Sequence, residues 1–288
     1  MILRLFAGLV AALALAACSA DEPAQEWPAP SPALWHVTGP DGAEGWLFGT
    51  VHALPQGATW ETPLVDQALD KAGVLVVEVA DLGDGQAAQA AFAHRAHSPA
   101  LPPLTQRFAA DQREAVAALI AAAGRTEGDF ADIETWAAAL LLAGGERLGD
   151  PALGVDRALL SRGMAVQGLE GFTAQYDVFD RLPQAEQADL LLAVADEVAA
   201  ADPAGSLSAW LTGDVAGLER RAFAGMMGDA ELRAALLDDR NAAWIAPIAA
   251  LLDGGRKPFV AVGAVHMLGN TGLPALLAAR GYTVTRIQ

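Results

Sequence analysis

Short apolar segments typical of strands lie near both ends of the chain, and a long region whose apolar residues recur at helical spacing separates them. Residues 34–38 and 45–48 flank the turn residues 39–42 and predict a β-hairpin. The run Val74–Val79 is apolar at every position but one, which is typical of a strand buried on both faces. Three more strands are predicted at residues 164–169, 257–262 and 282–287.

Between about residues 85 and 254 the apolar residues recur at helical spacing in alanine-rich segments. Pro247 is expected to kink the last helix of this region. The order of elements predicts an α/β (α+β) fold, in which both chain ends build a central mixed sheet around a large helical insertion. The predicted helices are residues 62–72, 109–123, 133–148, 155–162, 184–200, 207–211, 215–223, 230–252 and 271–279.

Residues 1–17 have the pattern of a bacterial lipoprotein signal peptide. Arg4 supplies a positive charge, Leu5–Leu15 is a short apolar stretch, and the small residues before Cys18 suit a cleavage site. The stretch is shorter than the roughly 20 apolar residues that cross a bilayer. Cys18 stands where a lipid is attached, and Ser19 rather than an aspartate follows it. We therefore expect a lipid anchor on Cys18, in the outer membrane and facing the periplasm, rather than a plain secretory signal.

Composition limits the domain layout, the cysteine chemistry and the binding partners expected of the chain after residue 17. Residues 18–33 hold four prolines and few core residues, so they predict a lipidated tether ahead of one domain, residues 34–288. Cys18 is the only cysteine, so its lipidation leaves no thiol for a disulfide or a cysteine metal site. A net charge of −17, from 35 acidic and 18 basic residues, argues against binding to nucleic acid or electrostatic adhesion to anionic lipid.

Two matching tetrapeptides carry the first sign of chemistry. Gly49–His52 and Gly263–His266 share the pattern Gly-x-x-His, and each follows an apolar, strand-like run. A histidine just past the end of a buried strand stands where open α/β proteins keep their ligands. The glycine allows the backbone to approach a neighbour or a ligand. So short a pattern also recurs by chance in a chain with 29 glycines, but the shared context predicts two converging imidazoles.

Glu78 is a third candidate, because it interrupts the valine-rich run Val74–Val79. A buried carboxylate is costly unless it is paired or bound to a metal. Together with His52 and His266 it would make a ligand set for a catalytic divalent ion such as zinc, manganese or cobalt, with a position left for water. The alternative is a strand-end carboxylate bonded to backbone or to an arginine, and the residues alone favour neither interpretation.

Three further positions are weaker candidates. Glu170 follows a predicted strand, and Asp156 opens a predicted helix, where capping is the expected role. Arg240 would hold a substrate oxyanion or orient Glu78, although the neighbouring Asp238 and Asp239 favour an exposed ion pair. The tryptophans are expected to lie in the core rather than to stack on a ligand.

These motifs, taken in order, resemble the TraB/GumN family from about residue 34 to the end. The family includes the Tiki-type proteases, which are metal-dependent and use paired Gly-x-x-His motifs with a glutamate. It is similar in fold to erythromycin esterases and to a haem-binding lipoprotein family. The resemblance implies that His52, Glu78 and His266 are metal or catalytic residues, and it favours a role for Arg240. It rests on Leu47–Pro55, Val76–Glu78, Gly154–Asp156, Gly168–Glu170, Gln175, Arg240–Asn241, Phe259–Leu268 and Gly272–Tyr282.

We therefore expect a membrane-tethered, metal-dependent hydrolase, and a peptidase in particular, that acts on a peptide or small-molecule substrate. The alternative is a non-enzymatic periplasmic lipoprotein that uses the same cleft for haem, a metal ion or a small ligand. A degenerate family member that scaffolds an envelope complex is a third hypothesis. A tightly held metal with an open water position would favour the enzyme, whereas a large apolar cleft without metal would favour the binding protein.

Overall fold

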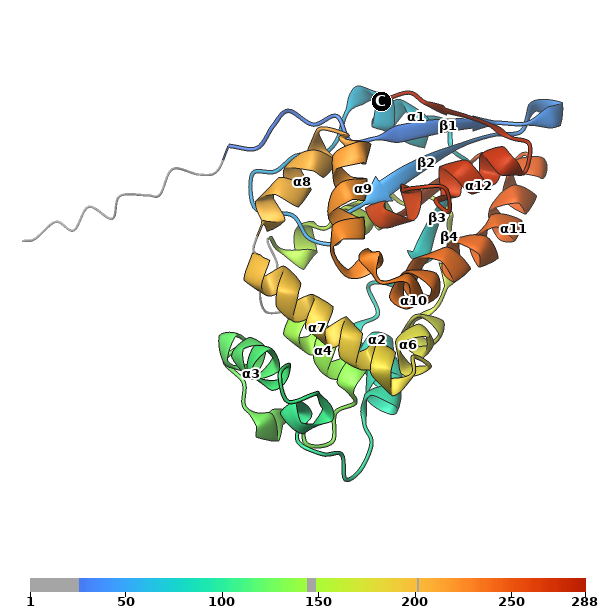
Figure 1. The fold of residues 1–288 in the computed structure, drawn as a ribbon. Helices are drawn as coiled ribbons and strands as arrows, with labels where there is room; N and C mark the ends of the chain where they lie inside the picture. The colour runs from blue at the N-terminus through green and yellow to red at the C-terminus, as the bar shows by residue number, and fades with distance from the viewer. Residues whose placement is uncertain (1–25, 144–148, 201) are drawn as a thin grey trace, which may run out of the picture.

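Six strands form one mixed sheet in the computed structural model, which describes residues 26–143, 149–200 and 202–288 (Figure 1). The order across the sheet is β4-β3-β5-β2-β1-β6. Strands β4, β3, β5 and β2 are parallel, whereas β1 runs antiparallel to both β2 and β6. The α/β prediction is confirmed, and both chain ends do build the sheet. The strands are β1 (Leu34–Thr38), β2 (Glu44–Thr50), β3 (Val74–Val79), β4 (Val166–Glu170), β5 (Pro258–Gly263) and β6 (Thr283–Arg286).

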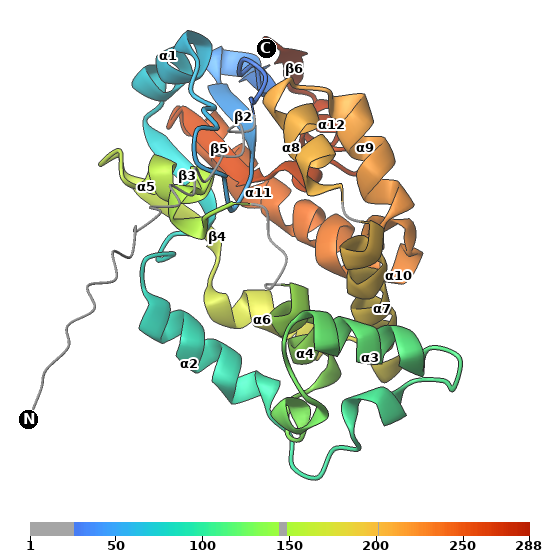
Figure 2. The same ribbon diagram turned by 90° about the vertical axis from the view of Figure 1, so that its left-hand side faces the viewer.

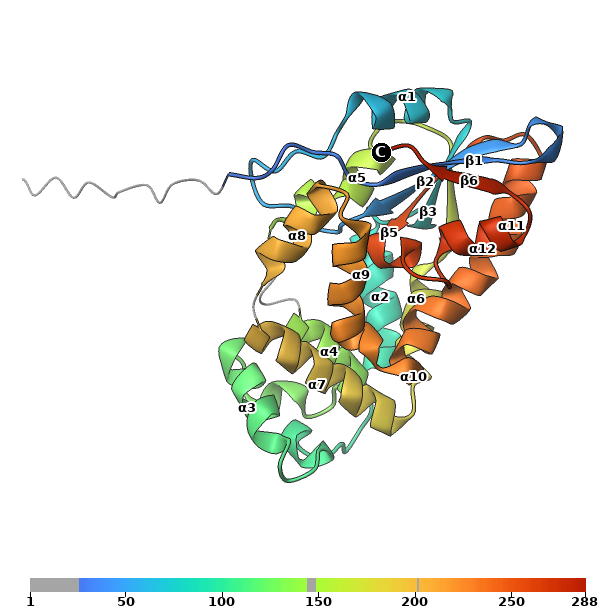
Figure 3. The same cartoon turned by 45° about the horizontal axis from the view of Figure 1, so that its top comes forward.

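Helices cover both faces of the sheet. Helices α1, α5 and α8 pack on one face and α11 and α12 on the other, and Figure 3 shows the strands between α1 and α11. Alternate residues of β3 serve the two faces: Leu75 and Val77 point toward the first, and Val74 and Val76 toward the second. These helices are α1 (Pro63–Lys71), α5 (Val155–Leu160), α8 (Pro203–Leu211), α11 (Asp239–Asp253) and α12 (Leu273–Ala279).

Part of the predicted helical insertion forms a lobe with its own core, built around the fully buried Trp136, and the rest packs against the sheet (Figure 2). Aromatic rings pack on this tryptophan, with Phe179 stacked at 6.1 Å between centroids and Phe92 edge-on at 5.6 Å. The lobe therefore has its own hydrophobic stabilisation. It consists of α2 (Gly85–Ala96), α3 (Arg113–Ala122), α4 (Thr135–Ala143), α6 (Phe172–Asp180), α7 (Gln184–Ala200) and α10 (Ala230–Arg233), and α9 (Val215–Ala224) lies beside α8.

The long helix predicted at residues 230–252 is interrupted ahead of Pro247. A π-helical turn, Ala234–Asp238, separates α10 from α11. Helix α11 then continues through Pro247 to Asp253. The turn directly precedes Arg240 and Asn241, and π-turns inside helices often occur at functional sites.

The first described residues lie against the domain. Residues 26–32 form neither helix nor strand, and the Ser31 N–H donates to the Leu211 carbonyl at 2.6 Å. The predicted signal peptide and Cys18 lie outside the described residues. Across the parts of the chain that the structure describes, every helix is too short or too polar to cross a bilayer.

Candidate functional site

The two Gly-x-x-His motifs lie side by side at one edge of the sheet. Strands β2 and β5 are parallel neighbours, and Thr50 pairs in register with Gly263. The segments that follow the two strands therefore leave the sheet at the same place. A Cβ added at Gly49 would lie 2.9 Å from the Cα of Ala264. Glycine at that position therefore lets the start of the second motif pack directly on the first, as the sequence predicts.

Glu78 reaches the same place from β3. It follows Val74 and Val76 in the two-residue alternation, so its side chain points to the face that α11 covers. Its Oε1 accepts the Gly263 N–H at 2.8 Å and lies 3.7 Å from Nε2 of His266. Two of the predicted metal ligands, one on β3 and one just after β5, are therefore in direct electrostatic contact.

Gly263 marks the point that all three predicted ligands face. An ideal Cβ built on this glycine would lie 3.2 Å from Oε1 of Glu78, 3.7 Å from Cδ2 of His266 and 3.8 Å from Nε2 of His52. A side chain here would fill the space between the three groups. The glycine of the second motif therefore keeps this space open.

His52 is held by a buried aspartate. Its Nδ1 lies 2.8 Å from Oδ2 of Asp156, and the other oxygen of Asp156 accepts the Thr50 hydroxyl at 2.7 Å. The His52 side chain is 66 % exposed, whereas that of Asp156 is 10 % exposed. The capping role expected for Asp156 is wrong, because Gly154 is the N-cap of α5 and both aspartate oxygens are used across the sheet edge. The hydrogen bond to Asp156 places the proton on Nδ1 and makes Nε2 the nitrogen that faces a ligand.

His266 is held in the same way by a neutral partner. Its Nδ1 lies 2.7 Å from Oδ1 of Asn241, a fully buried residue whose amide nitrogen donates to the Thr271 carbonyl at 2.9 Å. Since the amide nitrogen is used on Thr271, the oxygen must face His266, and Nδ1 of His266 must be the donor. The Trp244 ring packs on the imidazole at 4.5 Å between centroids. Trp244 is thus a core residue, as predicted, and also a wall of the site.

Arg240 connects the carboxylates of two neighbouring strands. Its Nη2 donates to Oε2 of Glu78 at 2.7 Å and contacts Oε1 of Glu170, while Nε donates to the other oxygen of Glu170 at 3.3 Å. Its Nη1 lies 3.3 Å from Nε2 of His266. The exposed ion pair expected for Arg240 is wrong, because its side chain is only 15 % exposed and Asp238 pairs with Arg233 instead. The alternative expectation, that Arg240 contacts Glu78, is what the structure shows.

The helical lobe adds one residue to the site. Gln175 on α6 donates its amide N–H to Oε2 of Glu78 at 3.3 Å and to Oε1 of Glu170 at 3.4 Å. The sequence singled out Gln175 only through the family resemblance, and no local pattern indicated this contact.

The pKa values in the site are strongly shifted. Burial opposes ionisation of Glu78, but the charges of His266, Arg240 and His52 and the Gly263 N–H outweigh it and lower its pKa to about 2. For His266, burial and the charges of Arg240 and His52 outweigh the attraction of Glu78 and lower the pKa to about 3. At neutral pH Glu78 is therefore an anion and His266 is neutral, as ligation to a metal requires.

The chemistry of the donor set suits a divalent ion. Glu78 offers a carboxylate oxygen, and both imidazoles are oriented through Nδ1, as metal-bound histidines usually are. The donor atoms are not gathered into a ready-made cluster, however. Within the described residues, one group has ligand atoms that all lie within 4.8 Å of one another, and it consists of Glu186, Asp229 and Glu231. That acidic group is at α7 and α10, and it contains none of the predicted ligands.

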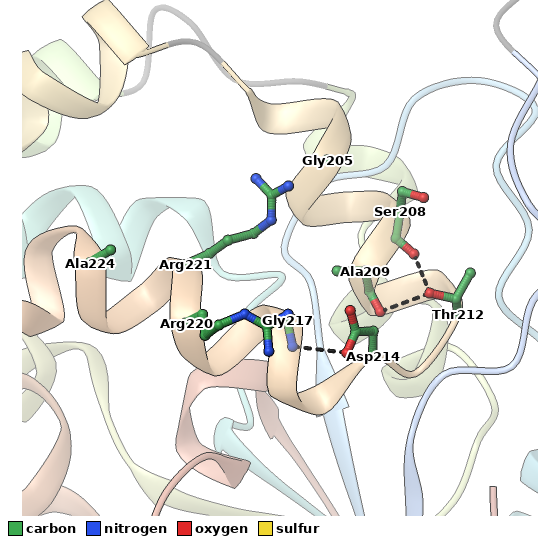
Figure 4. A pocket seen from close by; sticks show the side chains of 9 residues that line it. All are labelled: Gly205, Ser208, Ala209, Thr212, Asp214, Gly217, Arg220, Arg221 and Ala224. Carbon is green, nitrogen blue, oxygen red and sulfur yellow. Dashed lines mark hydrogen bonds between the residues drawn. The ribbon is translucent and has the colours of Figure 1, made fainter.

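An open groove of about 550 Å³ lies between α8 and α9, and none of its lining residues belongs to the site (Figure 4). Arg220 and Arg221 line it together with the hydroxyls of Ser208 and Thr212 and the carboxylate of Asp214. Asp214 accepts the Gly217 N–H at 2.8 Å as the N-cap of α9. Polar and apolar groups share the lining of this groove about equally.

Comparison with known proteins places this constellation in one family. The family model described as the TraB/PrgY/gumN family matches residues 33–286, which is nearly the whole described domain. Searches of curated proteins and of solved structures found no match. The match confirms the family resemblance seen in the sequence, and its range spans both Gly-x-x-His motifs. The chain belongs to the TraB/PrgY/gumN family.

Proposed function

We propose that this protein is a metal-dependent hydrolase, and a peptidase in particular, with His52, Glu78 and His266 as the metal ligands. The observation that carries the proposal is the common orientation of the two imidazoles. Each is bonded through Nδ1 to an oxygen of a buried side chain, and both rings face Gly263 beside the Glu78 carboxylate. Two histidines and a carboxylate are the protein ligands of several catalytic zinc sites.

The low pKa of Glu78 favours one of its two expected roles. A general base works best when its pKa is near the working pH, and a carboxyl group with a pKa of about 2 is too weak a base. The same shift makes Glu78 a permanent anion, which suits a ligand. A divalent ion bound there would lower the pKa of a coordinated water and polarise the carbonyl under attack.

The other polar groups of the site orient the proposed metal ligands or stabilise charge that develops in the reaction. The buried Asp156 carboxylate holds the exposed His52 ring in a single tautomer. The positive charge of Arg240, held near the site by Glu170, would stabilise negative charge on a carbonyl oxygen. Thr50 fixes Asp156, and Asn241 fixes His266.

The experiment is a peptide-cleavage screen on the purified chain beginning at Ser19. The protein, loaded in turn with zinc, manganese and cobalt, is incubated with an unstructured peptide library, and new termini are identified by mass spectrometry. We expect cleavage that a chelator abolishes and that Glu78→Gln reduces at least 100-fold. The matched control is Glu61→Gln, a surface carboxylate that pairs with Arg162. Cleavage that survives both the chelator and Glu78→Gln would contradict the proposal.

We also propose that Cys18 carries a lipid that tethers the domain to the outer membrane, facing the periplasm. The signal-like pattern of residues 1–17 and the cysteine that follows support this proposal. Cys18→Ser should move the protein from the membrane fraction to the soluble fraction of fractionated cells. Membrane association that is unchanged in Cys18→Ser would contradict the lipid anchor.

A further inference from the structure

We propose that Arg240 competes with the metal for the site, and that Glu170 holds the arginine aside when the metal binds. This inference rests on the proposed function, because it concerns how the same site takes up its metal. It assigns Glu170 a positioning role that acts only through Arg240.

The competition follows from the lone pairs that the site offers. Because Nδ1 of His266 donates to Asn241, Nε2 is the remaining nitrogen with a lone pair for a metal. The Nη1 of Arg240 lies 3.3 Å from that same Nε2. One lone pair does not serve an arginine N–H and a metal ion together.

The carboxylate of Glu78 is shared in the same way. Its Oε1 accepts the Gly263 N–H and its Oε2 accepts Nη2 of Arg240 at 2.7 Å, so the guanidinium neutralises the charge that a metal would use. A divalent cation beside an arginine that is only 15 % exposed would be repelled strongly. Metal binding at these ligands therefore requires the guanidinium to withdraw.

Glu170 already holds the guanidinium on the side away from His266. Its two oxygens contact Nε and Nη2 of Arg240, the edge of the guanidinium away from Nη1 and His266. A shift of the guanidinium that breaks its contacts with His266 and Glu78 leaves the pair with Glu170 in place, so the arginine keeps a carboxylate partner. Gln175 already donates to both glutamates, so Oε2 of Glu78 keeps a neutral donor after the shift.

The test is isothermal titration with zinc, manganese and cobalt of the purified wild type and five variants. Arg240→Met and Arg240→Gln remove the competitor and should bind metal at least tenfold more tightly than the wild type. Glu170→Gln removes the charge that draws the arginine aside and should bind about tenfold more weakly. The double variant Arg240→Met/Glu170→Gln should match Arg240→Met, because Glu170 acts through the arginine. Arg162→Met, at a surface ion pair with Glu61 and Asp66, is the matched control and should bind like the wild type.

The outcomes separate this inference from the proposed function. Thermal melts check that each variant is folded, and Arg240→Gln keeps a polar group should Arg240→Met unfold. Equal or weaker binding in both Arg240 variants, with metal bound to the wild type, overturns the competition and leaves the proposed function standing. Metal binding in the Arg240 variants but not in the wild type supports the competition and overturns the metal-dependent hydrolase. An absence of metal from all the proteins overturns both.

Discussion

Gly263→Ala places a methyl group where the three proposed ligands face one another. The backbone at Gly263 has φ −46° and ψ 137°, a conformation that alanine adopts without strain. The new methyl carbon would lie 3.2 Å from Oε1 of Glu78, which is tight, and 3.7–3.8 Å from the two imidazoles, which is ordinary contact. The substitution therefore perturbs the site far more than the fold.

The expected magnitudes follow from these contacts. Alanine restricts the unfolded chain and gains about 0.4–1 kcal/mol, which offsets the small displacement of Glu78, so the free energy of unfolding should change by less than about 1 kcal/mol. The methyl group fills the space between the donors, so metal affinity should fall at least tenfold, or about 1.4 kcal/mol. Denaturant unfolding measures the first quantity, and titration calorimetry measures the second.

Gly83→Ala is the matched control, since a Cβ at Gly83 has no neighbour within 4 Å. It should raise the stability by the same gain of about 0.4–1 kcal/mol and leave the metal affinity unchanged. The reasoning is refuted if Gly263→Ala binds metal as tightly as the wild type while its stability is unaltered. That result would mean that the metal, if bound, does not lie between His52, Glu78 and His266.

Three more predictions test the surroundings of the site. Asp156→Asn should weaken metal affinity about 10- to 100-fold in calorimetry, because a neutral amide accepts the His52 Nδ1–H more weakly than a carboxylate and leaves Nε2 a poorer ligand. An affinity equal to wild type would exclude that role. Asn241→Leu should lower the free energy of unfolding by about 2–5 kcal/mol in urea titrations, since it leaves His266 Nδ1 and the Thr271 carbonyl unpaired in the interior; a loss below about 1 kcal/mol would contradict this. The pKa of His266 is lowered from 6.5 to about 3 in the folded state, so between pH 6.5 and pH 3 the unfolded chain binds more protons than the folded chain. The contribution of His266 to the free energy of unfolding should therefore fall by at most about 5 kcal/mol as the pH falls through this range. In His266→Gln the free energy of unfolding should depend less on pH over this range. An unchanged pH dependence would refute the lowered pKa of His266.

Much of the sheet could be predicted from local pattern. The strand at Val74–Val79 is observed with the predicted bounds, because a run of β-branched residues suits a strand that is buried on both faces. Thr62 and Pro63 begin α1 as expected, with the Thr62 hydroxyl accepting the Val65 N–H at 3.3 Å. The order of the strands was not predictable, since β2 and β5 are separated by most of the chain and pair only in the folded protein.

The candidate site was predictable where it depends on strand ends and not where it depends on long-range packing. His52, Glu78 and His266 were found because each ends or interrupts an apolar run. Asp156 was expected to cap its helix because its actual partners, Thr50 and His52, lie more than 100 residues away in the sequence. Arg240 was expected at the surface because its neighbours are acidic, whereas the packing of α11 on β5 turns it inward toward Glu78.

The central claim is that His52 and His266 bind one metal ion together. The most direct measurement is the metal content and affinity of the purified chain beginning at Ser19, compared with His52→Ala and His266→Ala after loading with zinc, manganese and cobalt. The account predicts one ion per wild-type chain and its loss in both variants, with unchanged circular dichroism. A wild type that holds none of the three metals, or variants that retain the ion, would contradict it.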